Sequence, residues 1–226
     1  MDKAWIGILV VAVIVFIVVV AFVVGRQLER KRTEELRLVA DELGFEFQAE
    51  ADGLLAEGIG SLPLFSRGHS KKATNSMCKL VRDRDVILLD YKYTVGHGKH
   101  AHTHRHTVAV FQPDRHTRYP DFEMRPETFF HKIGAMFGYQ DIDFESHPKF
   151  SKRYLVRGTD ETGVRATFSR PVLDFLESSA TPWSVETRSN WLAIYHNTRA
   201  KPPEIRQFLT DTTKIFLMFG SQSSAS

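Results

Sequence analysis

One uncharged stretch near the amino terminus constrains this chain more than any other feature. Residues 4–25 contain no charged or strongly polar side chain and are rich in Val and Ile. A helix of these 22 residues extends about 33 Å, which matches a bilayer hydrocarbon core of about 30 Å. The run ends in AFVVGRQLERKR, without the small residues that precede a signal-peptide cleavage site. We therefore expect residues 1–25 to form an uncleaved transmembrane helix in a single-pass membrane protein.

Charges on either side of this run predict its orientation. Four basic residues follow it closely: Arg26, Arg30, Lys31 and Arg32. Because basic residues accumulate on the cytoplasmic side of a span, the N-terminus should lie outside and the folded domain in the cytoplasm. The single cysteine, Cys78, agrees with a reducing compartment. The four basic side chains are also the expected contacts with anionic lipid headgroups of the bilayer.

Charge is unevenly distributed beyond the span. Residues 33–65 carry a net charge of −7, and residues 66–118 carry a net charge of +7. We favour the interpretation that these two segments neutralise each other across the fold. The alternative is that the basic segment contacts anionic lipid or another polyanion.

Residues 28–43 form the first predicted helix after the span. Apolar residues recur there at helical spacing and would give the helix one apolar face: Leu36, Val39, Ala40 and Leu43. Gly44 suits the position that ends a helix. No proline separates this helix from the span, so the two could form one rod, bent only at Gly25.

The remaining pattern predicts an α+β domain with an antiparallel sheet, because helices and strands do not alternate strictly. Strands are expected at residues 45–47, 77–81, 86–95, 103–111 and near 153–157, with a hairpin in residues 183–197. Helices are expected at about residues 126–137 from Pro126, after Ser169 with Pro171, and from Pro203 to Gly220. The expected organisation is an anchor (1–25), a juxtamembrane helix (26–44), a cytoplasmic domain (45–220) and a frayed tail (221–226).

A histidine-rich segment, GHGKHAHTHRH at residues 96–106, holds five of the ten histidines. Alternate residues of a strand share one face roughly 6.5–7 Å apart, so four of these histidines would form a row. The four are His100, His102, His104 and His106. His-x-His is a ligand spacing for zinc, nickel or copper, and Asp90 or His116 could supply a third ligand. The row is therefore the candidate metal site.

Two strand registers would give the histidines different surroundings. If Val95 pairs with His100, the histidines share the face of Tyr91 and are partly buried. If the loop is one residue longer, Asp90 opposes His106 and the row lies in solvent. We expect the second register, because burying unpartnered imidazoles costs on the order of 1–3 kcal/mol each. A solvated hairpin end without stoichiometric metal is then favoured over a specific metal site and over a surface that charges near neutral pH.

Two further chemistries are considered and set aside. Hydrolase residue types occur in one segment: Ser146, His147 and Ser151, with Asp141, Asp143 and Glu145 upstream. Adjacent Ser and His side chains usually cannot meet, however, and no G-x-S-x-G elbow is present. Tyr91 with Lys92 could stack on single-stranded nucleic acid, yet aromatic core residues are the commoner explanation. No catalytic or cofactor-binding residue is therefore assigned, and nucleic acid is not expected as a partner.

Two stretches carry a resemblance: LLDYKYTVGHGKHAHTHRHTVAVF and FFHKIGAMFGYQDIDFESHPKFSKRYLVRG. They resemble a group of bacterial single-span membrane-anchored proteins of unknown function, over most of residues 26–219. The resemblance implies a bacterial inner-membrane setting and brings no catalytic residues. With the patterns above, it predicts a membrane-anchored cytoplasmic domain that binds or scaffolds an unidentified protein partner, rather than an enzyme. The alternative is a metal-handling protein or metalloenzyme that uses residues 97–106.

Overall fold

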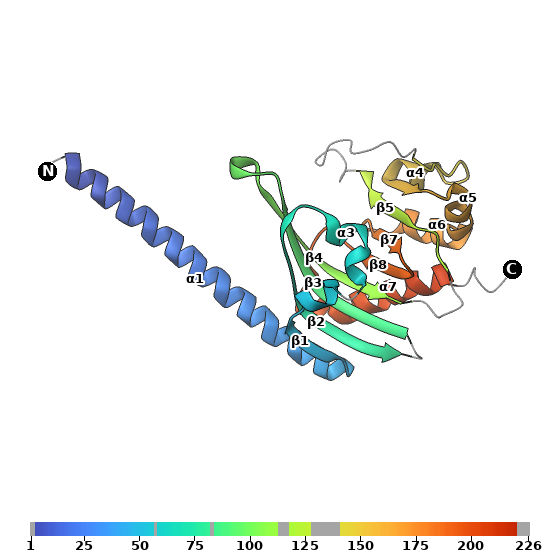
Figure 1. Ribbon diagram of the computed structural model, residues 1–226, viewed down its shortest axis with the longest axis horizontal. Helices are drawn as coiled ribbons and strands as arrows, with labels where there is room; N and C mark the ends of the chain where they lie inside the picture. The colour runs from blue at the N-terminus through green and yellow to red at the C-terminus, as the bar shows by residue number, and fades with distance from the viewer. Residues whose placement is uncertain (1–2, 57, 82–83, 113–117, 128–140, 221–226) are drawn as a thin grey trace.

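The computed structural model describes residues 3–56, 58–81, 84–112, 118–127 and 141–220 (Figure 1). One long N-terminal helix precedes an eight-stranded antiparallel sheet with helices packed on it, so the expected α+β class is confirmed. The helices are α1 Lys3–Leu43, α2 Asp52–Ala56, α3 Pro63–Ser66, α4 Pro148–Arg153, α5 Glu161–Thr167, α6 Arg170–Ser178 and α7 Ile205–Gly220, with short 3₁₀ helices η1 Ile59–Ser61, η2 Gly98–His100 and η4 Pro202–Glu204. The strands are β1 Glu46–Glu50, β2 His69–Val81, β3 Arg84–Val95, β4 His102–Phe111, β5 Phe122–Pro126, β6 Tyr154–Gly158, β7 Ser184–Arg188 and β8 Trp191–Tyr195.

Helix α1 joins the apolar run to the juxtamembrane helix without a break at Gly25. The large apolar side chains of residues 8–24 are 42–69% exposed, and this half of α1 stands away from the domain (Figure 1). It is long and apolar enough to cross a membrane. Such a surface is strongly unfavourable in water, and this half of the helix is the candidate membrane anchor. Gly44, at φ +68°, ends the helix as expected, and the next N–H, from Phe45, donates to the carbonyl of Ala40 at 2.9 Å.

The strands lie in the order β1-β2-β3-β4-β8-β7-β5-β6, and neighbouring strands pair in antiparallel orientation. The expected meander is confirmed for β2, β3 and β4, although β2 begins at His69 rather than at residue 77. At the end of the β3–β4 hairpin, Gly96 adopts φ +77°, and a Cβ atom there would lie 2.4 Å from the carbonyl oxygen of His100. Glycine is therefore required for this tight end of the hairpin.

The two faces of the sheet carry separate cores. On one face the C-terminal part of α1 packs with α6 and α7, burying Leu36 and Ala40. The last helix was expected to present a stripe of six residues to the core. Leu209 is only half-buried, and the other five are buried: Ile205, Phe208, Thr212, Phe216 and Phe219. On the other face, η1 and α3 cover the aromatic side chains of β3 and β8. Since Leu36 and Ala40 belong to the first core, the folded domain includes part of the juxtamembrane helix and does not begin at residue 45.

Two local expectations change in the structure. Pro126 does not open a helix but is the last residue of β5, a strand-end position where its missing N–H group is tolerated. Residues 128–140, where most of that helix was expected, lie outside the described residues. The sequence patterns also missed α4 and α5. The sequence does contain an N-cap residue for α5, because the Asp160 side chain accepts the N–H of Gly163 at 2.9 Å.

A candidate membrane-interface site

A buried ion pair fastens α1 to the sheet. The Arg32 guanidinium donates through Nε to Asp90 Oδ2 at 2.7 Å and through Nη2 to Asp90 Oδ1 at 2.8 Å. These side chains are only 11% and 5% exposed. Thr107 and Asn75 also donate to the Asp90 carboxylate, each at 3.0 Å, and Arg32 Nη1 donates to the carbonyl of Ala200 at 2.9 Å. Arg32 was expected to contact lipid headgroups; this expectation is corrected, because its guanidinium is enclosed by protein partners.

Further contacts fix the direction of α1 relative to the domain. Arg199 donates to both carboxylate oxygens of Glu29, at 2.7 and 2.9 Å, and these bonds lower the pKa of Glu29. Thr33 donates to the side-chain carbonyl of Asn75 at 2.9 Å, and Arg206 donates to Glu42 at 2.7 Å. Because these contacts extend over several helical turns, residues 29–42 of α1 are held against the domain in a fixed direction.

Strand β3 is linked to α1 by the buried pair of Asp90 and Arg32, and its far end extends toward the amino-terminal half of the helix (Figure 1). Lys79, which pairs with the first residues of β3, donates to the carbonyl of Leu43 at the domain end of α1. Asp90 of β3 forms the ion pair with Arg32. Two residues further along β3, Lys92 lines a cleft together with Ala21, Phe22, Gly25 and Arg26 of α1. From Asp90 to the strand end β3 rises about 17 Å, whereas only about 9 Å of helix separates Arg32 from the start of the span. The hairpin end therefore extends past the start of the apolar run, and it projects to the same side as the free half of α1 (Figure 1).

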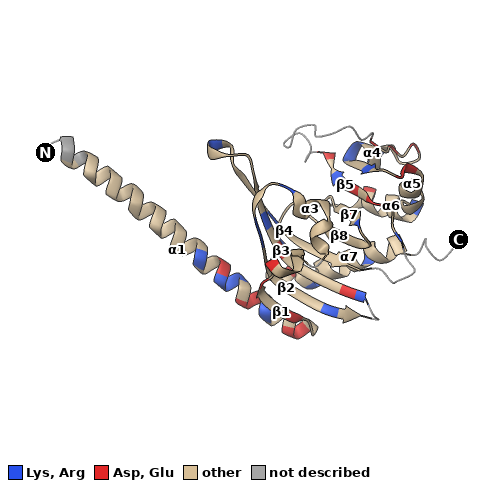
Figure 2. Cartoon of the chain, viewed as in Figure 1, with Lys and Arg blue, Asp and Glu red and all other residues tan. Residues whose placement is uncertain are grey.

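The cleft lies where α1 leaves the apolar run and has a volume of about 550 Å³. Phe22, Arg26 and Arg30 of α1 line one side, and Lys92 and Arg105 of the hairpin line the other. Figure 2 shows the first charged residues of α1 at this junction, after the uncharged half of the helix. Three of the four expected headgroup contacts, at positions 26, 30 and 31, are exposed and lie beside or in this cleft.

The histidine row does not lie where the sequence argument placed it. The observed pairs are Val95 with His102, Tyr93 with His104 and Tyr91 with His106, so the register that we expected is wrong. His106 is fully buried; its Nδ1 hydrogen-bonds the carbonyl of His196 at 2.8 Å, and its ring stacks on Tyr93. The expected cost of burial applied to imidazoles without hydrogen-bond partners. In the fold, His106 has both a hydrogen-bond partner and a stacked aromatic ring, so its burial costs less.

The other histidines of the row have different environments, so the four candidate ligands are not equivalent. His100 and His102 are exposed near the hairpin end, His104 is half-buried, and the other proposed ligand, His116, lies outside the described residues. Asp90, the alternative third ligand, is engaged by Arg32 on the opposite face of the strand. Within the described ranges, no three His, Cys, Asp or Glu side chains are arranged to hold a metal ion.

Burial of His106 predicts a specific acid sensitivity. Loss of hydration lowers the pKa of His106 from 6.5 to about 4. As the pH falls from 6.5 toward 4, the unfolded chain takes up a proton that the folded chain does not, so folding stability is lost across this window. The contribution is about 3 kcal/mol. We expect His106→Gln, which keeps a donor for the His196 carbonyl, to lose less stability than wild type between pH 7 and pH 4.

Urea unfolding of the full chain in mild detergent, followed by tryptophan fluorescence, measures this difference. The matched control is His102→Gln, which removes an exposed histidine two residues away and should keep the wild-type acid sensitivity. Equal losses of stability on acidification in wild type and His106→Gln would contradict the assignment.

The second core encloses a charged cluster that the sequence patterns did not indicate. Arg67 Nη1 donates to the Tyr195 hydroxyl at 2.9 Å, and Nη2 donates to both Glu123 and Glu186. Glu186 is fully buried and also accepts the N–H of Leu64 at 2.7 Å. Burial raises the pKa of Glu186, and the Arg67 guanidinium partly offsets this effect. The cluster ties the segment after α3 to β5, β7 and β8, so we assign it a structural role.

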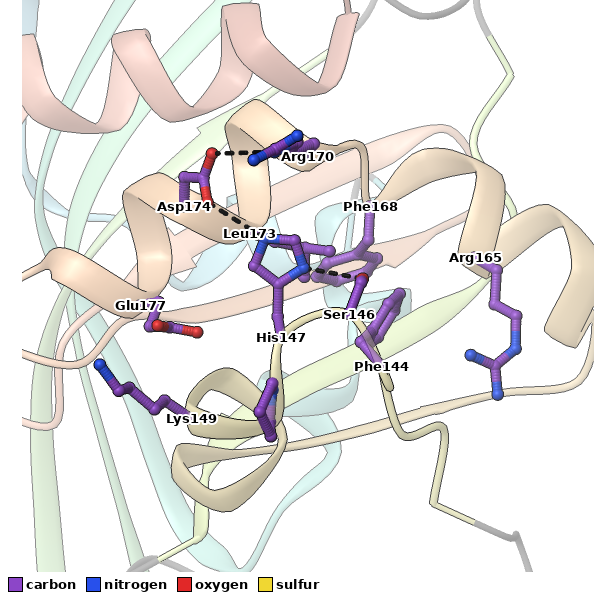
Figure 3. A pocket seen from close by; sticks show the side chains of 11 residues that line it. Phe144, Ser146, His147, Lys149, Arg165, Phe168, Arg170, Leu173, Asp174 and Glu177 are labelled. Atoms are coloured by element: carbon purple, nitrogen blue, oxygen red, sulfur yellow. Dashed lines mark hydrogen bonds and ion pairs between the residues drawn. The ribbon is translucent and has the colours of Figure 1, made fainter.

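A second hollow of about 670 Å³ lies between the segment before α4 and helices α5 and α6 (Figure 3). Ser146 Oγ lies 2.9 Å from Nδ1 of His147, and Nε2 of His147 lies 3.1 Å from Asp174 Oδ1. Adjacent Ser and His side chains were not expected to meet; in the structure they do, and this expectation is corrected. The acidic partner of His147 is Asp174 of α6, rather than Asp141, Asp143 or Glu145, the acids considered from the sequence.

Neither of the two residues that follow Ser146 offers a free backbone N–H for the oxyanion of an acyl-transfer reaction. The N–H of His147, which follows Ser146, already donates to the carbonyl of Phe144 at 2.8 Å. The next residue is Pro148, which has no N–H. Asp174 is 61% exposed and also faces Arg170 at 3.8 Å. We therefore interpret the contacts among these three side chains as structural: they hold the segment before α4 against α6.

Comparisons with known proteins identify a similar fold. No protein-family model matches the sequence, and no curated protein sequence matches it. A crystal structure with a similar fold is that of the mycobacterial trehalose monomycolate transport factor A, TtfA, with a TM-score of 0.61. The match covers 85% of this chain and 94% of the TtfA chain, at 12% sequence identity. At this identity, the likeness shows that the two chains share their fold over most of their length.

Proposed function

We propose that this protein is a membrane-anchored binding or scaffold protein whose domain is held at the cytoplasmic surface of a bacterial inner membrane. One observation carries the proposal: α1 continues unbroken from the apolar run into a buried ion pair between Arg32 and Asp90. A flexible tether would only keep the domain near the bilayer. A continuous, docked helix also sets which face of the domain meets the membrane and which face is presented to a partner.

Three further features support this role. Arg26, Arg30 and Lys31 are exposed at the end of the span, where they can contact anionic headgroups. The same basic residues favour a cytoplasmic domain with the N-terminus outside. The fold is shared with TtfA, whose name describes a transport factor for trehalose monomycolate; this supports an accessory role at a membrane rather than a catalytic one. The identity of the protein partner is to be determined by the experiment below.

The proposal is tested by cross-linking in intact membranes followed by pull-down of the full chain. A flexible Gly-Ser insertion between Gly25 and Arg26 leaves the docked part of α1 unchanged but frees the domain from its fixed orientation. We expect wild type to retain a defined partner set, and the insertion variant to lose most of it while remaining folded and membrane-bound. A chain without residues 1–25 should lose the set as well. If that soluble chain captures the same proteins in the same amounts, the anchored role is wrong.

The orientation of the protein in the membrane is measured with C-terminal reporter fusions in the cells used for cross-linking. A reporter that works only in the cytoplasm should be active. Activity of a reporter that requires the periplasm would overturn the orientation.

A further inference from the structure

We propose that the cleft between α1 and the β3–β4 hairpin binds the phosphate-bearing headgroup of an anionic membrane phospholipid. The inference rests on the proposed function, because it takes the domain to sit at the bilayer surface. It adds a specific site and a ligand class to the general attraction between basic residues and the membrane.

The first observation is the charge of the cleft. Four cations line it: Arg26, Arg30, Lys92 and Arg105. None of the four makes an ion pair with a carboxylate among residues 3–56, 58–81, 84–112, 118–127 and 141–220. The two carboxylates of the lining, Glu29 and Glu34, pair instead with Arg199 at 2.7 Å and with Arg37 at 3.8 Å. The Arg105 guanidinium also helps to lower the pKa of Glu29, so this carboxylate partly offsets one of the four cations. The lining keeps an excess of positive charge.

The second observation is the strand register within the cleft. Lys92 and Arg105 lie directly opposite each other on β3 and β4, and both side chains are exposed. Like charges at directly opposed positions destabilise a sheet. An anion between the two side chains would convert this repulsion into two attractive contacts, and a phosphate can accept hydrogen bonds from both ammonium and guanidinium groups.

The third observation is the apolar wall. Ala21 and Phe22 also line the cleft, and both belong to the membrane-spanning run. One end of the cleft is therefore apolar and faces the hydrocarbon, while the other end is cationic and faces the domain. A glycerophospholipid has the same arrangement, with acyl chains below its phosphate. A soluble phosphate compound would leave the apolar wall unused.

The same charges predict selectivity among phospholipids. Phosphatidylglycerol carries a net negative charge, whereas the phosphate of phosphatidylcholine is accompanied by a quaternary ammonium. That ammonium would be repelled by the four cations of the cleft. We therefore expect the cleft to prefer the anionic lipid over the zwitterionic one.

Native mass spectrometry of the full-length protein in mild detergent tests the proposal. The protein is supplied with equal amounts of phosphatidylglycerol and phosphatidylcholine, and retained lipid is counted per chain. We expect wild type to retain one phosphatidylglycerol in preference to phosphatidylcholine. Removing both hairpin cations in Lys92→Ala/Arg105→Ala should weaken retention about thirtyfold, at about 1 kcal/mol for each basic residue.

A charge-matched control separates this site from general attraction. Arg170→Ala/Lys201→Ala removes two cations that are 85% and 80% exposed and do not line the cleft. It should retain phosphatidylglycerol like wild type. Equal loss in the two double variants, or equal retention of the two lipids by wild type, would overturn the proposal.

A competition arm distinguishes lipid from a soluble ligand. Excess glycerol 3-phosphate should leave the bound lipid in place, and its displacement of the lipid at low concentration would assign the cleft to a soluble phosphate compound instead. Failure of these lipid measurements does not affect the partner retention and reporter measurements, which test anchoring and scaffolding separately.

Discussion

A chain that begins at residue 26 should fold as a soluble domain, whereas a chain that begins at residue 45 should not. The second truncation removes Leu36 and Ala40 from the first core and takes Arg32 away from Asp90. Burial of a large aliphatic side chain contributes about 1.5–3 kcal/mol, and loss of the ion-pair partner adds several more. Their sum is comparable with the whole net stability of a domain, about 5–15 kcal/mol.

Circular dichroism and urea unfolding of the two purified chains in the absence of detergent measure this effect. The chain from residue 26 should give one cooperative transition, and the chain from residue 45 should aggregate or show none. Equal stability of the two chains would mean that residues 26–44 are a linker, and it would remove the structural basis for a rigidly held domain.

Replacing Arg32 with alanine in the chain that begins at residue 26 should lower the free energy of unfolding by about 3–5 kcal/mol. The substitution leaves the Asp90 carboxylate, which is 5% exposed, without its cationic partner. The matched control is Lys31→Ala on the same helix. Lys31 is 74% exposed and lies 3.8 Å from Glu35, so its loss should change stability by less than about 0.5 kcal/mol.

The double variant Arg32→Ala/Asp90→Asn identifies the cause of the loss. Neutralising the orphaned carboxylate should recover part of the stability, because an amide costs less to bury than an unpaired charge. Urea unfolding at pH 7 gives all four values. If Arg32→Ala is no more destabilising than Lys31→Ala, the ion pair does not hold α1 to the domain.

Features encoded in nearby residues were predictable. The apolar run of residues 4–25 and the stripe from Ile205 to Phe219 repeat over short distances, so their pattern indicates secondary structure directly. Gly44 ends α1 for a local reason, because it adopts a backbone conformation that other residues disfavour. Arg26, Arg30 and Lys31 are exposed in the structure. Their contact with lipid headgroups, named from their position after the span, stays a prediction.

Strand register was the point at which local reasoning failed. A shift of one residue exchanges the faces of a strand, and the sequence offered only the cost of burying histidines to choose between the alternatives. The partner that makes burial of His106 tolerable is the carbonyl of His196, which is 90 positions away in the chain. The pairing of Lys92 with Arg105, on which the lipid cleft depends, follows from the same register.

By itself, then, the sequence determined that the protein has a candidate membrane span, an α+β domain and a basic junction between them. Each of these features is encoded by residues that are close together in the sequence. Only the tertiary structure decided which charges are buried and which are free. Arg32 and Asp90 are 58 positions apart, and Arg67 and Glu186 are 119 apart. Whether a charge binds a membrane lipid or a buried carboxylate depends on the groups that folding brings within hydrogen-bonding distance, and no local pattern records those groups.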